Sequence, residues 1–309
     1  MLSAIGHTPL VRLSRIVPDG AADVWVKLEY YNPTGSYKDR MARSMIERAE
    51  QRGALKPGMT VVEYTGGSTG ISLAFVCAVK GYRCRIVCND AVAAEKRRSM
   101  EVFGAELEVL KSDGGKLTPD LVPRMMARAQ EIAAEGPSYA TDQMRNPDMV
   151  AGYESLGEEL LQQVDGPIHA FCAAIGTAGM LMGTARVLRR AYPGGATRIV
   201  ALEPATSAVL SGGVAGRHGV EGVAPGFVPP QFDRAMVSET RAIDEADARR
   251  MAWTLARQEG LFAGTSTGLN VVAALQIARE LGAGHTVVTV AVDSGLKYLA
   301  GDLYGGAPG

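Results

Sequence analysis

The sequence lacks the features that mark several large classes of protein. Its 309 residues contain no uninterrupted apolar run of about 18 residues, the length that a membrane-spanning helix needs. The formal net charge is −1 and charges of both signs are interspersed, so no basic surface for nucleic acid is expected. The first residues, MLSAIGHTPLVRL, lack the basic and then apolar layout of a signal peptide. We therefore expect a cytoplasmic protein that binds neither membranes nor nucleic acid.

Cysteine is also scarce. The four cysteines stand in or beside apolar segments, and their spacing matches neither a zinc site nor the disulfide framework of a small secreted domain. We expect buried, reduced thiols and no metal. Hydrophobic residues, by contrast, make up 47% of the chain, which is enough for one large or two medium domains with buried cores.

Short β-branched runs alternate with helical patterns along most of the chain. This alternation is typical of βαβ units on a parallel sheet, and the apolar run HTVVTVAV at 285–292 suits a strand covered on both faces. The expected strands are 60–65, 83–89, 105–110, 167–175, 197–203 and 285–292. The expected helices are 71–80, 93–103, 118–135, 148–164, 178–192, 244–259 and 268–281. The sequence therefore predicts an α/β protein with two lobes and a cleft between them.

Lys38 stands between the turn residues NPTGS and the start of a helical pattern. Met41, Met45 and Ala49 recur on one face of that helix, and Gly53 follows its end. A lone lysine at a helix start is more often solvated than catalytic. At a loop-to-helix junction, however, its side chain can point into a cleft.

Gly-rich turns follow strands or precede helices at TGGSTG (65–70), GTAG (176–179), the 211–226 passage and GTSTG (264–268). Ligands of α/β sheets bind at the carboxyl ends of strands, and free N–H groups at helix starts favour anions. GTAG is the best candidate for a phosphate cradle, although each turn alone is a weak signal. Together with Lys38 these turns suit a phosphorylated aldehyde held as a Schiff base. NAD is the weaker interpretation, because no G-x-G-x-x-G motif with a distal acid is present.

NPTGSYKDR resembles the lysine motif N-P-x-x-S-x-K-D-R of the cysteine synthase/cystathionine β-synthase family, the fold-type II enzymes that use pyridoxal 5′-phosphate (PLP). The resemblance runs nearly end to end and in the right order. Further segments that carry it are IGHTPLVRL (5–13), TGGSTG, TDQMRNP (141–147), GTAGM, LSGGVAGRHGVEGV (210–223), GTSTG and DSGLKYL (293–299). These motifs are specific for the family and much less specific for the reaction.

The resemblance implies a two-lobed fold like that of tryptophan synthase β, in which each lobe is a mainly parallel twisted sheet covered by helices. The larger, PLP-binding lobe would comprise 12–35 and 146–309. The smaller, mobile lobe would comprise 36–145 and bind substrate, with 1–11 as an N-terminal segment. A homodimer is expected, and a serine acyltransferase is a candidate partner.

The resemblance also assigns the cofactor site. Lys38 would be the catalytic residue, forming the Schiff base and moving the substrate Cα proton. Ser68 would contact the cofactor's 3′-oxygen in place of the family's asparagine. Ser266 would hydrogen-bond the pyridine nitrogen, and it also suits the N-cap of the 268–281 helix.

The phosphate would be held by Gly176, Thr177, Ala178, Gly179 and Met180. Ala178 and Met180 replace a glycine and a threonine of the family motif. Ala178 is expected to keep its N–H in the cradle if its φ is negative, and Met180 lacks the hydroxyl of the threonine.

The substrate α-carboxylate would bind Thr65, Gly66, Thr69 and Gln143. Gly66 removes a hydroxyl from this site, and Ala224 replaces a family glycine in a segment expected to line the pocket. Tyr153 could face the pocket, but a core or surface position is equally compatible with the sequence.

The implied function is β-replacement on an activated L-serine, O-acetylserine or O-phosphoserine, through an α-aminoacrylate intermediate. Sulfide would then give L-cysteine. Alternatives are another nucleophile (an amine, a hydroxyurea-like group or homocysteine) or a PLP-binding protein without turnover. A dehydratase ranks lower, because it usually has an asparagine-glycine substrate loop and often a second domain.

Overall fold

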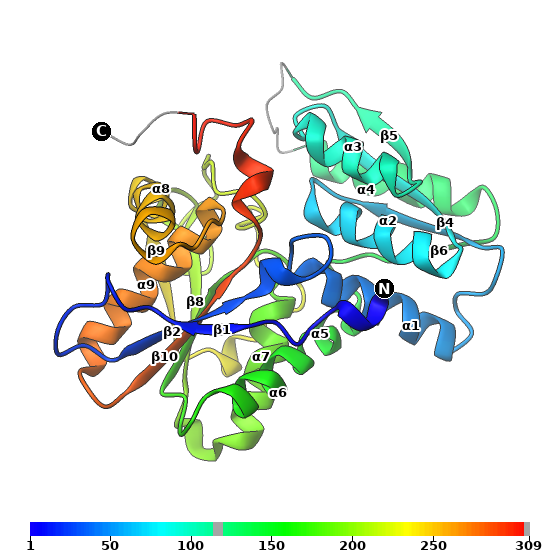
Figure 1. Ribbon diagram of the computed structural model, residues 1–309. Coiled ribbons are helices and arrows are strands. Elements are labelled where there is room, and N and C mark those ends of the chain that lie inside the picture. The colour runs from blue at the N-terminus through cyan, green and yellow to red at the C-terminus, as the bar shows by residue number, and fades with distance from the viewer. Residues whose placement is uncertain (114–119, 306–309) are drawn as a thin grey trace. The chain divides into compact units, whose positions relative to one another are not determined.

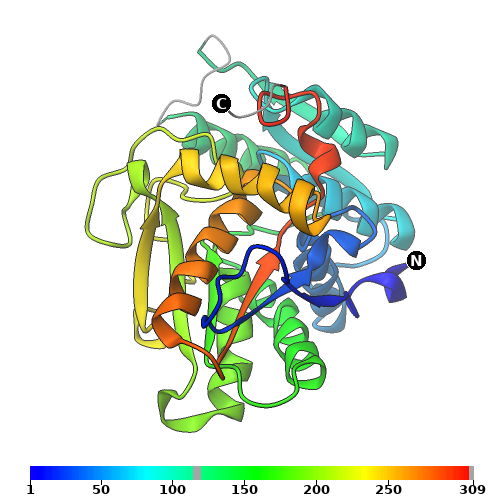
Figure 2. The same cartoon turned by 60° about the vertical axis from the view of Figure 1, so that its left-hand side comes forward.

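The computed structural model describes residues 1–113 and 120–305 and divides the chain into two compact units. Unit 1 comprises Met1–Ile5 and Lys38–Gly152, and unit 2 comprises Gly6–Tyr37 and Tyr153–Gly309. Each unit has its own sheet covered by helices (Figures 1 and 2). The predicted α/β class and the mainly parallel sheets are confirmed.

The sheet of unit 1 has four parallel strands in the order β5-β4-β3-β6. Thr60 of the central strand β3 pairs with Arg83 on one side and Ser138 on the other, so β3 is paired with a neighbouring strand along both edges. The bounds are β3 (Thr60–Tyr64), β4 (Arg83–Asn89), β5 (Glu106–Leu110) and β6 (Ser138–Ala140).

The helices of unit 1 bury apolar side chains against this sheet or against one another. Met41, Met45 and Ala49 are fully buried, as their spacing predicts. Gly152 lets α5 approach α1 closely, because a Cβ there would lie 2.8 Å from the carbonyl oxygen of Arg40. The bounds are α1 (Lys38–Gln51), α2 (Ser68–Lys80), α3 (Ala94–Val102), α4 (Leu121–Ala134) and α5 (Pro147–Gly152). Residues 118 and 119 of the helix expected at 118–135 lie outside the described residues.

The sheet of unit 2 has six strands in the order β1-β2-β10-β7-β8-β9, of which only the β1–β2 pair is antiparallel. The largely apolar strand β10 lies between β2 and β7, and its residues after Thr286 are all buried, as expected for a central strand of a sheet that helices cover on both faces. The bounds are β1 (Leu10–Arg12), β2 (Asp23–Leu28), β7 (Ala170–Ala174), β8 (Arg198–Pro204), β9 (Glu239–Ile243) and β10 (Thr286–Ala291).

Two helix pairs, α6–α7 and α8–α9, cover the sheet of unit 2 (Figure 1). Glycine permits the close approach within each pair. A Cβ on Gly157 of α6 would lie 2.7 Å from Val187 Cβ of α7, and one on Gly268 of α9 would lie 2.0 Å from the carbonyl oxygen of Ala248 of α8. The bounds are α6 (Glu154–Gln163), α7 (Gly179–Ala191), α8 (Glu245–Thr254) and α9 (Thr265–Leu281).

Short helical turns complete the two units. They are η1 (Leu2–Ala4), η2 (Glu29–Tyr31), η3 (Pro193–Gly195), η4 (Ala205–Ser207), η5 (Arg234–Met236), the π-helical η6 (Leu255–Glu259) and η7 (Gly295–Tyr298). In the described part of the chain, no helix has the length and apolarity to cross a bilayer. All four cysteines are free and buried: Cys77, Cys84, Cys88 and Cys172.

Some expected elements differ from those observed. The single helix expected at 148–164 is two helices, α5 and α6, because the helical hydrogen bonding is interrupted at Tyr153. The helix expected at 244–259 is α-helical as far as Thr254 and closes as a π turn that ends at Gly260, whose φ is 70°. The strands β1, β2, β6 and β9 were not predicted.

Candidate active site

Lys38 is the first residue of α1, and only 6% of its surface is exposed. The two residues before it are anchored in unit 2. The N–H of Tyr37 donates to the carbonyl oxygen of Val292 (3.1 Å), and Ser36 forms an antiparallel bridge with Asp293. These contacts hold Ser36 and Tyr37 at the carboxyl end of β10. The interpretation of Lys38 as a solvated surface lysine is therefore wrong.

In unit 1, the predicted substrate residues come from loops that follow the neighbouring strands β3 and β6. The Thr69 hydroxyl donates to Oε1 of Gln143 (2.7 Å), and Nε2 of Gln143 donates to the carbonyl oxygen of Tyr64 (3.0 Å). Thr65 closes the loop by accepting the N–H of Gly67 at its hydroxyl (3.1 Å). Thr65, Thr69 and Gln143 are thus brought together as buried polar groups.

The other two predicted residues of this loop differ in exposure. Gly66 is exposed, and a Cβ at this position would meet no heavy atom within 4 Å. Ser68 is half-buried and opens α2, three residues earlier than the sequence pattern indicates. The free N–H groups of this helix start can favour an anion, as a substrate carboxylate requires.

In unit 2, the predicted phosphate residues occupy the turn between β7 and α7. A Cβ on Gly176 would lie 2.4 Å from the carbonyl oxygen of Gly222, so no side chain fits there. The N–H of Ala224 donates to the carbonyl oxygen of Ile175 (2.7 Å), which holds the 222–224 segment beside the turn. Thr177 and Met180 are buried. The turn leads into a 13-residue helix, whose unpaired N–H groups and dipole favour a phosphate.

Ala178 is the N-cap of α7 and has a φ of 68°. The negative φ on which the placement of the Ala178 N–H in the cradle was made conditional is not found. The turn requires left-handed backbone at this position, where the family motif has glycine, and alanine adopts it despite the steric cost. Ala224, the second replaced glycine, likewise has a φ of 44°.

Ser266 lies in the first turn of α9, with 2% of its surface exposed. It is not the N-cap, because α9 begins at Thr265 and Gly264 is the N-cap. Among the described residues, no hydrogen bond involves the Ser266 hydroxyl. Asn270, one turn further on, donates to the carbonyl oxygen of Val290 (2.9 Å) and accepts the N–H of Ala174 (2.8 Å), which fixes this end of α9 to β10 and β7.

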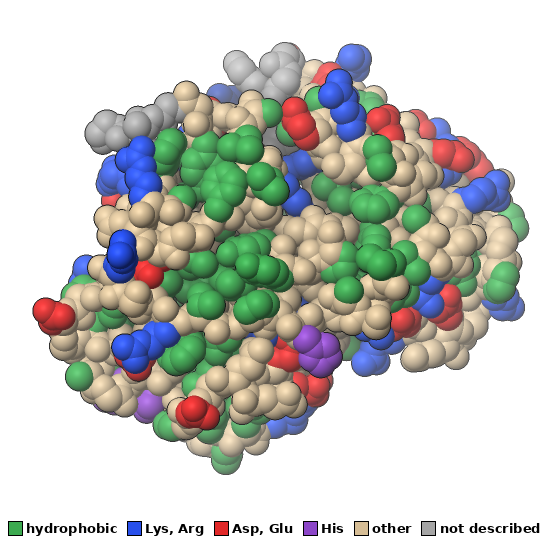
Figure 3. Space-filling model, in the orientation of Figure 1, with side chains coloured by type: hydrophobic (Ala, Val, Ile, Leu, Met, Phe, Trp, Pro, Cys, Tyr) green, Lys and Arg blue, Asp and Glu red, His purple; other side chains and the backbone are tan. Residues whose placement is uncertain are grey.

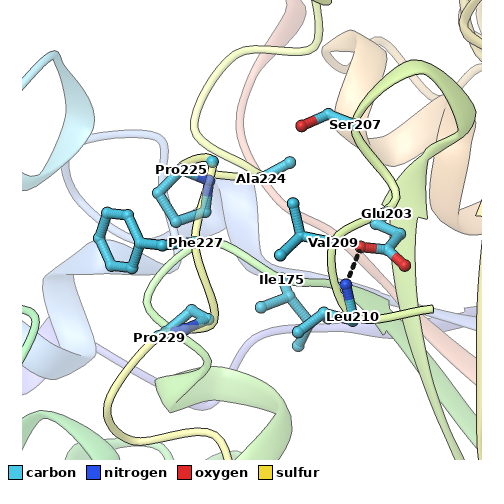
Figure 4. A pocket seen from close by; sticks show the side chains of 10 residues that line it. Ile175, Glu203, Ser207, Val209, Leu210, Ala224, Pro225, Phe227 and Pro229 are labelled. Carbon is cyan, nitrogen blue, oxygen red and sulfur yellow. Dashed lines mark hydrogen bonds between the residues drawn. The ribbon is translucent and has the colours of Figure 1, made fainter. Parts of the chain in front are cut away.

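A pocket of about 220 Å³, partly open to solvent, adjoins the turn after β7 (Figure 4). Ile175 and Ala224 belong to its wall, and Pro225, Phe227 and Pro229 make it largely apolar. Its carboxylate, Glu203, is occupied by the N–H of Leu210 (2.8 Å). An apolar lining with a carboxylate does not suit a phosphate.

The family model for "pyridoxal-phosphate dependent enzyme" matches residues 1–293. The chain belongs to this family. It is 43% identical over 304 residues to a cysteine synthase of Staphylococcus aureus. The alignment covers 97% of this chain and 95% of that relative. The protein is a PLP-dependent enzyme.

Solved structures of the family have the same fold. A cysteine synthase from Entamoeba histolytica aligns with a TM-score of 0.90 and 35% identity over 98% of this chain and 89% of its own. An O-ureido-L-serine synthase aligns with a TM-score of 0.89 and 37% identity over 99% of this chain and 94% of its own.

The residues of this PLP-dependent enzyme fit the cofactor. Gly176 and the start of α7 provide an anion site without side-chain obstruction, and Ser266 provides a buried hydroxyl that no described residue engages. Lys38 is the buried amine that a Schiff base with the cofactor aldehyde requires.

Two ionisable residues near the substrate loop were not predicted from the sequence. Glu63 of β3 is buried, and burial raises its pKa to about 8. Lys96 of α3 is buried as well, and its Cδ lies 3.4 Å from the position of a Cβ on Gly67. The signal for Glu63 was a lone acid within the apolar run TVVEYT. Tyr153 proves to be a core residue, with its ring centroid 5.5 Å from that of Tyr37.

Proposed function

We propose that this PLP-dependent enzyme makes L-cysteine by β-replacement on an activated L-serine, either O-acetylserine or O-phosphoserine, with sulfide. One observation carries the proposal: Lys38, in the family's lysine motif, is buried at the first position of α1. Bound PLP supplies the electron sink that makes the Cα proton of an amino acid acidic. Lys38 removes this proton as the β-substituent leaves and returns it after the nucleophile adds to Cβ.

The other residues bind and orient. In unit 1, the hydroxyls of Thr65 and Thr69, the N–H groups of the Gly66 loop and the amide of Gln143 hold the substrate α-carboxylate, and Ser68 contacts the cofactor. In unit 2, the N-terminus of α7 holds the phosphate and Ser266 hydrogen-bonds the pyridine nitrogen. A neutral hydroxyl leaves that nitrogen largely unprotonated, which favours β-elimination over racemisation. The phosphate residues are Gly176, Thr177, Ala178, Gly179 and Met180.

A second candidate is the same reaction with another nucleophile, such as a hydroxyurea-like group, an amine or homocysteine. Its support is the O-ureido-L-serine synthase, which is as similar to this chain as the Entamoeba cysteine synthase. Gly66 and Ser68, which depart from the usual cysteine synthase motif, lie in the substrate loop. The nucleophile must therefore be tested rather than assumed.

The first experiment is to record the visible spectrum of the PLP-loaded protein during titration with O-acetylserine and, in parallel, O-phosphoserine. We expect one of them to change the cofactor absorbance, and sulfide to restore it with release of L-cysteine. Restoration by hydroxyurea or homocysteine, but not by sulfide, would select the second candidate. A spectrum that neither amino acid changes would contradict both, and would indicate a binding protein without turnover.

Matched lysine variants serve as controls for this titration. Lys38→Ala should abolish the release of L-cysteine, because it removes the group that moves the proton. Lys56→Ala, which alters an exposed lysine of the same unit, should behave as the unmodified protein does. Equal behaviour of the two variants would contradict the role of Lys38.

We also propose that the enzyme is a cytoplasmic homodimer, with a serine acyltransferase as a candidate partner. Figure 3 shows apolar side chains gathered on one face of unit 2. Tyr31, Leu296 and Leu299 of this unit are exposed apolar side chains, and the segments that carry them adjoin where Gly35 meets Ser294. Four free thiols fit a reducing compartment. Light scattering measures the mass, and a monomer would contradict the dimer.

A further inference from the structure

Glu63 is a buried acid that the proposed reaction does not use. It lies in β3 with 1% of its surface exposed. Its Oε1 accepts the N–H of Tyr64 (2.9 Å), and its Oε2 lies 3.0 Å from the N–H of Gln143 and 2.7 Å from the hydroxyl of Thr141. One carboxyl group therefore connects β3 to the segment after β6, at the residue whose side chain binds Thr69.

The hydroxyl of Thr141 can serve either protonation state of this carboxyl. Thr141 Oγ1 lies 2.7 Å from Glu63 Oε2 and 3.2 Å from the carbonyl oxygen of Val62, but a hydroxyl has a single hydrogen to donate. Donation of this hydrogen to Oε2 serves an ionised Glu63 and leaves Val62 with the main-chain N–H of Thr141 (3.0 Å), whereas a protonated Glu63 donates to Thr141, which then donates to Val62. Oε2 of the neutral acid still accepts the N–H of Gln143. The neutral form keeps these contacts without a buried charge.

We propose that Glu63 is the positioning residue of the substrate-carboxylate site: its carboxyl group fixes the main chain of Gln143 so that the side chain of Gln143 meets Thr69. The inference rests on the proposed function, because it takes the loop 65–69 and Gln143 as that site. Ionisation would add a negative charge next to a group that binds an anion. This repulsion weakens substrate binding.

The titration of Glu63 gives this proposal a pH signature. Burial is the largest cause of its raised pKa, which is about 8, and the negative charge of Asp142 adds to the shift. Binding of amino-acid substrates should therefore weaken above about pH 8. The titratable or charged groups around it are Tyr64 on its own strand, Cys84 on β4 with its partner Cys77 on α2, and Asp142 and Arg145 after β6. Glu63 also lines a small pocket together with Met126 and Gln130 of α4, and neither of these side chains carries a charge.

The test is Glu63→Gln in the PLP-loaded enzyme. An amide nitrogen donates but cannot accept, so either the N–H of Tyr64 or that of Gln143 loses its acceptor. We expect KM for the amino-acid substrate to rise about tenfold, roughly the effect of one lost hydrogen bond, with kcat changed by less than about twofold. The rise of KM above pH 8 should disappear. Glu106→Gln, at an exposed glutamate of β5, should keep the KM and the pH profile of the unmodified enzyme.

If Glu63→Gln does not fold, variants of Thr141 test the same hydrogen bond. Thr141→Val should raise KM, whereas Thr141→Ser, which keeps the hydroxyl, should restore it. Infrared spectroscopy of the unmodified protein should show a protonated carboxyl band that is lost between about pH 7 and 9. Unchanged KM in Thr141→Val, or a carboxyl that is ionised at pH 6, would overturn the proposal.

Failure of the proposed function would look different. If O-acetylserine and O-phosphoserine are not substrates, the α-carboxylate site can still be tested with L-methionine, whose binding would change the cofactor absorbance. Weaker L-methionine binding in Glu63→Gln than in Glu106→Gln would then support the role of Glu63. Equal binding in both variants would overturn it.

Discussion

Ala178 and Ala224 hold left-handed backbone that glycine adopts at lower cost. An L-residue in this conformation costs roughly 1–2 kcal/mol, and the greater unfolded-state entropy of glycine offsets part of that difference. We therefore expect Ala178→Gly to raise the free energy of unfolding of the cofactor-free protein by about 0.5–1 kcal/mol. Chemical denaturation followed by tryptophan fluorescence measures this change, because both tryptophans lie in unit 2.

Ala246→Gly is the matched control for this substitution. Ala246 is an exposed residue of α8 without a positive φ, so glycine should lower stability there by up to about 1 kcal/mol. A gain in unfolding free energy for Ala178→Gly together with a loss for Ala246→Gly would show that the backbone strain lies at the α7 turn. A loss of stability in Ala178→Gly would contradict it.

Ser266 and Asn270 lie one turn apart on α9 but make different contacts. The Ser266 hydroxyl bonds to no described residue, whereas Asn270 bonds to the main chain of β7 and β10. Ser266→Ala should therefore change stability by less than about 0.5 kcal/mol while lowering kcat. Asn270→Ala should destabilise unit 2 by about 2–4 kcal/mol, because it removes the hydrogen-bond partner of one buried and one partly buried main-chain group. Thermal unfolding and steady-state kinetics together separate the two roles.

At the scale of elements, the sequence predicted those whose pattern is strong and local. β4 occupies the predicted range 83–89, because a β-branched run flanked by turns needs no tertiary information. The three-residue strand β6 has too few residues to show a period, and its pairing with β3 becomes visible only in the folded unit. β9 (ETRAI) mixes charged and apolar residues, as an edge strand can.

The starts of α2 and α9 were each predicted three residues late, for a related reason. Both helices begin inside Gly/Ser/Thr loops, TGGSTG and GTSTG, whose composition is typical of turns. Tertiary packing overrides this composition at Gly268, where α9 passes the carbonyl oxygen of Ala248 too closely for any side chain. Glycine here is a requirement of the α8–α9 contact rather than a helix breaker.

Gly268→Ala tests that contact. A Cβ 2.0 Å from a carbonyl oxygen forces the two helices apart, and we expect a loss of about 2–3 kcal/mol in unfolding free energy. Gly301→Ala adds the same methyl group in unit 2, at 3.6 Å from the carbonyl oxygen of Tyr298, and should be tolerated. Thermal melts of the two variants make the comparison, and equal melting temperatures would contradict the packing argument.

At the scale of the whole molecule, the site residues named from the sequence were those within recognisable motifs. Lys38, the Gly176 turn and Ser266 each stand in one, and the structure places them at the starts of α1, α7 and α9. Glu63 could not be assigned in this way. Its contacts come from Thr141 and Gln143, some 80 residues away, and strand periodicity does not specify which strands pair.

Glu63 also makes overall stability depend on pH. Its pKa is raised from 4.5 to about 8, so between these values the folded protein binds a proton that the unfolded chain has released. The free energy of unfolding should therefore fall as pH rises from 4.5 to 8, by up to about 1.4 kcal/mol per pH unit. Denaturation of Glu63→Gln across this range should lack this decline, whereas Glu106→Gln should retain it. Parallel curves for all three proteins would contradict a neutral Glu63.

Unit 2 holds the predicted contacts to the cofactor phosphate and to the pyridine nitrogen, and this predicts where these two parts of the cofactor stabilise the chain. A ligand slows hydrogen exchange most at the amides next to its binding site in the native state. At a concentration of about 100 times its Kd, it raises the free energy of unfolding by about 2.7 kcal/mol. PLP should slow the amides of 176–182 and of 264–270. Pyridoxal, which lacks the phosphate, should slow only 264–270, and inorganic phosphate only 176–182. If inorganic phosphate instead protected 65–70 of unit 1, the α7 turn would not be the phosphate site. The three ligands therefore test which glycine-rich turn binds the phosphate and which binds the pyridine ring, because each should protect a different set of amides from exchange.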